Sequence, residues 1–123
     1  MTRPALPAGW PAGVDPPGAP DWQRSATAWL FDQCPAGYRG YAVLRTHPLV
    51  LARFAATATD AAIAAADAGL RVVRAELGGR VPPETVDAAV AAYEQERHRL
   101  RTARHAVDLV ERALRGERWV PRL

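Results

Sequence analysis

Residues 48–115 read PLVLARFAATATDAAIAAADAGLRVVRAELGGRVPPETVDAAVAAYEQERHRLRTARHAVDLVERALR, and this stretch decides the fold. Its two alanine-dense halves have nearly equal length and the hydrophobic spacing of long helices, at 48–78 and 83–115. Only Gly79, Arg80, Val81 and Pro82 lie between them. Because so short a link makes consecutive helices antiparallel neighbours, the sequence predicts an all-α fold built on a helical hairpin.

The two predicted helices differ in how much apolar surface they carry. On the first, the charges Arg53, Asp60, Asp67 and Arg74 recur every seven residues and, with Arg71 close beside them, form one narrow stripe. Most of the remaining circumference is apolar, whereas a surface helix has a wider polar face. We therefore expect the 48–78 helix to be central and covered on at least two sides. The 83–115 helix has one ordinary apolar seam, with Pro83 at its start and Gly116 after its end.

Outside the hairpin, the sequence predicts an extended arm, a short helix and a tail. Six of the eleven prolines fall in residues 1–20, which indicates an extended proline-rich arm that cannot form a helix. Residues 21–33 predict a short helix with Asp21 as its N-cap, and 42–46 a single turn. The tail, 116–123, is expected to fold back over the helices. Residues 21–123 are thus predicted to form one helical domain.

Alanine-lined helices bury little area, so a hairpin of this kind needs additional cover. The short helix can supply it on one side, and a second copy of the hairpin can supply it on the other. We expect a homodimer that forms a four-helix bundle, ahead of closure as a monomeric three-helix bundle.

Composition bounds the class of protein. All sixteen basic residues are arginines and alanine occurs 26 times, a bias typical of a GC-rich bacterial genome. The single cysteine excludes an intrachain disulfide framework. The N-terminus does not resemble a signal peptide, and no uncharged apolar run reaches the length of a membrane span. We expect a cytoplasmic protein with no membrane association.

Charge is distributed unevenly along the second long helix. Residues 80–96 sum to −3 and residues 97–123 to +5. Acid early and base late complements the helix dipole, which weakens the case for nucleic-acid binding. The basic part nevertheless forms the best electrostatic feature of the chain, and we take it as the candidate partner-binding surface: Arg97, His98, Arg101, Arg104, His105, Arg112 and Trp119.

The remaining reactive residues favour ordinary structural roles. His98 and His105 lie on one helical face among arginines, without the three or four converging ligands of a metal site, so no metal or cofactor is predicted. Cys34 lies at the negative end of its helix, which favours a structural thiol with a raised pKa. His47 is expected to form a local hydrogen bond, and no catalytic residue is predicted.

The leading hypothesis is a non-enzymatic interaction protein that self-associates and scaffolds or regulates a protein partner, which the sequence does not identify. The second hypothesis is nucleic-acid binding through residues 97–122. The third is an enzyme or ligand carrier with a pocket near Trp29, Tyr38, Tyr41 and His47.

Overall fold

The chain is all-α within residues 5–120, the part that the computed structural model describes. Its helices are α1 Trp22–Asp32, α2 Ala42–Thr46, α3 Pro48–Leu77 and α4 Pro83–Leu114, with a 3-10 helix, η1 Ala36–Gly40, between α1 and α2. The boundaries predicted for the two long helices and for the short one are confirmed to within a residue or two. Between the predicted short helix and the predicted turn at 42–46, residues 36–40 form η1.

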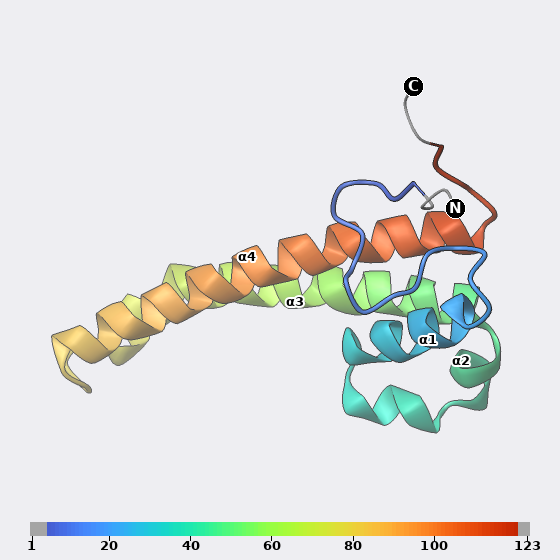
Figure 1. Cartoon of the computed structure of the whole chain (residues 1–123). Helices are drawn as coiled ribbons and strands as arrows, with labels where there is room; N and C mark the ends of the chain where they lie inside the picture. Colours follow the sequence, from blue (N-terminus) through green and yellow to red (C-terminus); the bar gives the residue numbers. More distant parts are fainter. Residues whose placement is uncertain (1–4, 121–123) are drawn as a thin grey trace.

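α3 and α4 form the predicted antiparallel hairpin (Figure 1). Pro48 and Pro83 each occupy a first-turn position, where the missing N–H of proline costs no helical hydrogen bond. The turn between the helices depends on Gly79, whose φ of 78° is accessible to glycine at little cost. α4 is followed by Gly116 at φ 102°, as its sequence position predicts.

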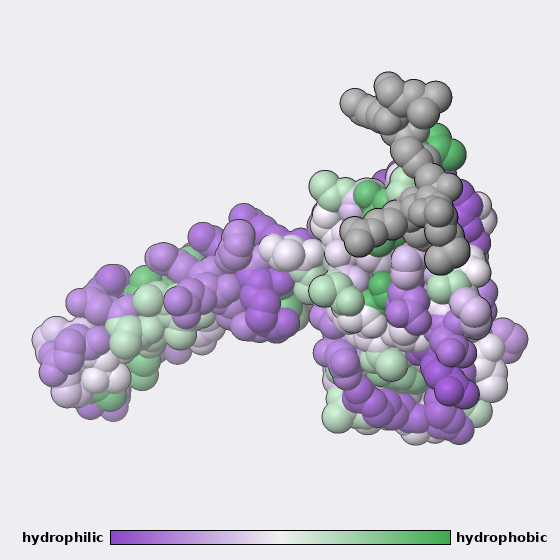
Figure 2. Space-filling view, viewed as in Figure 1, coloured by the Kyte–Doolittle hydropathy of each residue, from purple (hydrophilic) through white to green (hydrophobic). Residues whose placement is uncertain are grey.

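The molecule has a thick base and a narrow projection, which Figure 2 shows as a space-filling surface. In the base, α1, η1 and α2 pack beside the first part of α3, and the last part of α4 closes the other side (Figure 1). Fully buried side chains from four helices meet there: Leu30, Leu44, Leu51, Val107 and Val110. Beyond the base, α3 and α4 continue alone as a two-helix projection, residues 60–78 and 83–103, which we name the distal hairpin.

The proline-rich segment lies across the outside of α4 and is held by the chain's other end. Ala5 forms an isolated antiparallel bridge with Trp119, and the Trp10 and Trp119 rings meet edge to face at 5.8 Å between centroids. The Trp10 indole Nε1 donates a hydrogen bond of 2.9 Å to the carbonyl of Val14. Within the described residues, the proline-rich segment forms successive turns rather than the predicted extended arm, and the tail meets it through Trp119. Residues 1–4 and 121–123 lie outside the described part.

The proline-rich segment also covers part of α4 that does not belong to the apolar seam facing α3. Ala106 and Leu109 are buried but lie outside the core cluster to which Val107, Val110 and Ala113 belong. Leu109 approaches Gly9 of the proline-rich segment, so the segment supplies the cover. On α1, Trp22, Ala26, Leu30 and Phe31 are buried and Trp29 is half-buried.

Candidate functional site

The candidate site is the side of α3 that faces away from α4 and that the base stops covering. α3 is central only through its first twelve residues, where Leu51, Ala52, Ala55, Ala56 and Thr59 are buried. Further along the helix only Ala66 and Val73 are buried. A second copy of the hairpin, expected as part of the cover of this helix, stays a prediction. Within one chain, the distal part of α3 is covered by α4 alone. The reason is that α1, η1 and α2 are too short to follow α3 along its whole length.

A regular apolar strip runs along the uncovered side, which we name the outer face of α3. Its members recur at steps of four and three residues: Phe54, Ala58, Ala61, Ala65, Ala68, Val72 and Ala75. Phe54 and Val72 are 43% and 42% exposed, and apart from the half-buried Ala58 the alanines are exposed as well. Such alternating steps are the seam with which one helix packs on another.

An aromatic group marks the point where the outer face meets the base. The Tyr38 ring of η1 meets Phe54 edge to face at 6.0 Å and Tyr41 at 6.2 Å between centroids. Tyr41 is mostly exposed, as is much of Phe54. The outer face therefore begins at an exposed aromatic group and continues as small side chains to the tip.

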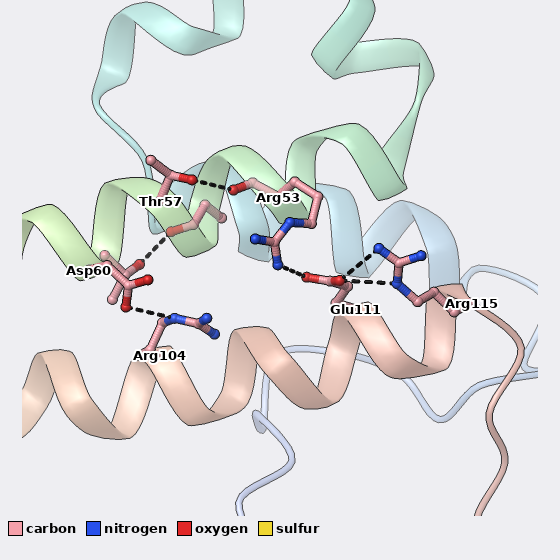
Figure 3. Close-up of polar contacts among 8 residues, drawn as sticks. Arg53, Thr57, Asp60, Arg104, Glu111 and Arg115 are labelled. Carbon is pink, nitrogen blue, oxygen red and sulfur yellow. Dashed lines mark hydrogen bonds and ion pairs between the residues drawn. The ribbon is translucent and has the colours of Figure 1, made fainter.

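Most of the charged stripe of α3 is not available to another molecule, because four of its residues form ion pairs with α4. Arg53 pairs with Glu111, Asp60 with Arg104, Asp67 with Arg97, and Arg74 with Asp87, at N···O distances of 2.8, 2.9, 3.3 and 3.0 Å. Figure 3 shows the two pairs nearest the base.

These four pairs specify the register of the hairpin more than they stabilise it. Exposed ion pairs are each worth about 0–1 kcal/mol. The order of charges along α3 is plus, minus, minus, plus, and α4 presents the opposite sign at each position. A slip of seven residues would place Arg53 beside Arg104 and Asp67 beside Asp87. Like-charge contacts of this kind would disfavour the slipped hairpin.

Two charged residues of α3 are left outside this set. Arg71 and Glu76 are both exposed and form no ion pair with any residue of the described chain. On the helix they flank the outer face from opposite sides, with Arg71 on the side of the ion pairs. The outer face is thus an apolar strip bordered by one cation and one anion.

Glu111 is the one buried carboxylate of the set, at 8% exposure. Burial opposes its ionisation, but hydrogen bonds from Arg53 and Arg115 together outweigh that effect, and the pKa of Glu111 lies below its ordinary value. The carboxylate therefore ties α3 to the end of α4 inside the base (Figure 3).

We expect Glu111→Gln to lower the free energy of unfolding at pH 7 by about 1–3 kcal/mol, because charge-assisted hydrogen bonds are lost in a buried setting. A depressed carboxyl pKa stabilises the fold above the unfolded value, about 4.3, and that contribution disappears as the pH falls through the folded pKa. Urea unfolding should therefore show that the free energy of unfolding falls more between pH 7 and pH 3 for the wild type than for the variant. Glu94→Gln, at an exposed position, is the control, and equal pH dependence in all three proteins would contradict the assignment.

The seven residues predicted as a partner surface do not form one open surface in the structure. Arg97 and Arg104 point to α3, as described above. Arg112 is hydrogen-bonded to Glu117, and its guanidinium lies over the Trp119 ring at 5.7 Å. The His105 ring lies against Gly9 and is 3.4 Å from the carbonyl of Ala8. His98 and Arg101 remain exposed. A partner-binding role for the set stays a prediction.

The reactive residues of the base have local partners. The Cys34 thiol donates to the carbonyl of Leu30 at 3.4 Å. Burial raises the pKa of this thiol, while Arg39 acts in the opposite direction, so the predicted direction is confirmed with burial as its main cause. His47, between α2 and α3, is exposed, and its backbone N–H donates to Val43. No group of three or more metal-ligating side chains occurs within residues 5–120.

A hollow of about 420 Å³ lies at the elbow where the distal hairpin leaves the base. The end of α1 and Tyr38 line it on the base side, and Ala58, Ala61, Ala62, Glu96 and Arg99 line it on the hairpin side. Trp29 lines a separate hollow on the other side of α1, with Gly13 and Asp21. The structure therefore does not gather Trp29 and Tyr38 into one pocket, as the third hypothesis required.

Neither similarity to known proteins nor the hydropathy of the helices identifies the function of the chain. No protein-family model, curated protein or solved structure matches the chain. By length and composition α3 could cross a membrane, with a mean hydropathy of 1.4 over its most apolar window. This is weak support for a span, since the central helix of a water-soluble fold has the same composition. A cytoplasmic location stays a prediction.

Proposed function

We propose that the chain is a non-enzymatic helical interaction protein that presents the outer face of α3 to another protein helix and so scaffolds or regulates that partner. The observation that carries the proposal is the regular apolar strip left uncovered on the distal hairpin. Contiguous exposed apolar surface in a folded protein commonly marks an interaction site. A seam with alternating steps of three and four residues suits a helical partner in particular.

The arrangement of the chain supports this function. The base holds the first part of α3 rigidly, with Leu51 and Ala55 fully buried, and so fixes the direction in which the distal hairpin projects. The ion pairs with α4 keep the register of the hairpin. Together they present the outer face as a preformed surface, which lowers the entropic cost of binding.

Nucleic-acid binding through α4 receives less support. Arg97, Arg104, Arg112 and Arg115 each pair with a carboxylate of the same chain. Nucleic-acid binders instead direct their cations to phosphates. The charges that would neutralise a phosphate backbone are largely compensated here.

The test is affinity purification of the tagged chain from its source cells, followed by mass spectrometry. We compare the wild type with Ala65→Arg on the outer face and with Ala91→Arg on the exposed side of α4. Both alanines are exposed helical residues of the distal hairpin, so the control matches in residue type and helix propensity. At least one protein should be retained by the wild type and by Ala91→Arg and lost with Ala65→Arg. An identical set of proteins for all three would contradict the proposal.

A further inference from the structure

We infer that the partner seated on the outer face is a second copy of this chain, packed antiparallel so that the tip of each distal hairpin meets the base of the other. This inference rests on the proposed function and names the partner of that same site. Three properties of the face support it: its palindromic spacing, the complementary sizes of its side chains, and the charge of Arg71, which forms no ion pair within the described chain.

The spacing of the outer face reads the same in both directions. From Ala58 through Ala75 the steps are 3, 4, 3, 4 and 3 residues, with Phe54 four residues before this run and Gly79, in the turn after α3, four residues beyond it. Two such helices in opposite directions therefore face each other position by position. Phe54 lies opposite Gly79 of the second copy, Ala58 opposite Ala75, Ala61 opposite Val72, and Ala65 opposite Ala68.

Side-chain sizes are complementary in this register. Val72 meets an alanine, and Phe54, the largest residue of the face, lies at the level of the turn after α3, where Gly79 carries no side chain. The centre is built from alanines, which allow two helix backbones to approach closely. Such pairing of large with small side chains is how helical layers interdigitate without voids.

The shape of the molecule selects the antiparallel arrangement over the parallel one. Tyr38 of η1 lies against Phe54, so the base flanks the outer face where that face begins. In a parallel dimer two Phe54 rings would coincide and the two bases would compete for the same space. In the antiparallel dimer a narrow tip meets each base instead (Figure 1).

The charges that border the face on the Arg71 side are complementary about the same axis. A twofold axis perpendicular to the helices places the Arg71 side of the outer face of one copy beside the same side of the other copy. In this register Arg71 of one copy lies within two residues of Asp60 of the other along the helix axis. Asp60 is exposed, and only its Oδ1 accepts from Arg104, which leaves Oδ2 for a second guanidinium. On the other flank, Glu76 lies at the level of the elbow hollow, where Arg99 already pairs with Glu96, so only the Arg71 flank contributes a complementary charge pair.

Cysteine cross-linking tests the arrangement in the full-length chain, with Cys34→Ser as the background. Ala61→Cys and Val72→Cys are each prepared alone and as an equimolar mixture, and treated with a short bismaleimide. The antiparallel dimer predicts a cross-linked dimer in the mixture and little in either single variant. In that dimer the two copies of residue 61 would lie about 16 Å apart along the helix axis, at about 1.5 Å per residue. A parallel dimer would reverse the result and overturn the inference.

A charge reversal provides the second readout. Arg71→Glu should weaken self-association at least about tenfold by light scattering over a concentration series, which corresponds to about 1.4 kcal/mol. Arg101→Glu, at an exposed position of α4, is the matched control and should leave it unchanged. A wild-type chain that stays monomeric at tens of micromolar would overturn the inference. If the purification above still retains another protein through Ala65, the proposed function survives that result.

Discussion

Replacing Leu51 by alanine is expected to lower the free energy of unfolding by about 2–5 kcal/mol, the range for a buried leucine whose removal leaves a cavity. Leu51 is fully buried in the base, in a cluster with Leu30, Leu44 and Val110. The base contains most of the large buried side chains, so it must supply most of the stability of the chain.

Urea unfolding followed by two probes checks this. Trp10, Trp22, Trp29 and Trp119 all lie in the base, so their fluorescence reports the base alone, whereas far-UV circular dichroism reports every helix. Val72→Ala is the control, measured at a concentration where the chain is monomeric. Because Val72 is 42% exposed in the monomer, its truncation should cost less than about 1 kcal/mol. Equal losses for Leu51→Ala and Val72→Ala would contradict the division into base and distal hairpin.

The sequence predicted the helices well because their ends carry strong local signals. Pro48, Pro83, Gly79 and Gly116 each mark a boundary through backbone preferences that do not depend on tertiary contacts. The seven-residue spacing of Arg53, Asp60, Asp67 and Arg74 was also visible. The ion pairs that these four residues form with α4 could not be predicted from α3 alone, because they depend on the register between the two helices.

Coverage of α3 could not be predicted from its own composition. A helical wheel averages the whole helix, and the surplus of apolar residues is real along all thirty positions of α3. It cannot show that α1, η1 and α2 cover only the first part of the helix. The same limitation hid the burial of Leu109 on α4, which the proline-rich segment approaches at Gly9.

The candidate surface moved from α4 to α3 for an electrostatic reason. Arginines 97 and 104 looked available because their helix was considered alone. Asp67 and Asp60 lie opposite them across the hairpin and take up their charge. Arg71 belongs to the charged stripe that the sequence shows, whereas Glu76 does not. That both residues form no ion pair in the described chain follows only from the observed ion pairs.

Shortening the distal hairpin by seven residues in each helix is expected to separate association from folding. Deleting residues 67–73 and 91–97 together removes one ion pair, Asp67–Arg97, and keeps the other three in register, because seven residues are close to two helical turns. The base is untouched, and Tyr93 is lost together with Gly69, on which its ring packs. We therefore expect a folded helical monomer whose tryptophan fluorescence and thermal midpoint stay close to those of the wild type.

Self-association should fall at least about 100-fold in this variant, because each copy loses Val72, Ala68 and Arg71 from the outer face. Fully burying an exposed valine side chain is worth about 1.5–3 kcal/mol, and Val72 is 42% exposed in the monomer, so the dimer gains about 0.6–1.3 kcal/mol from it in each copy. At about 1.4 kcal/mol per tenfold change in Kd, the two valines account for roughly tenfold or more, and the loss of Arg71 accounts for the rest. Light scattering over a concentration series measures the change in Kd. The control is the full-length chain with Ala91→Arg, which changes surface charge without any deletion. If the shortened chain associated as tightly as the wild type, the dimer contact would have to lie on the base, and the outer face would lose its role.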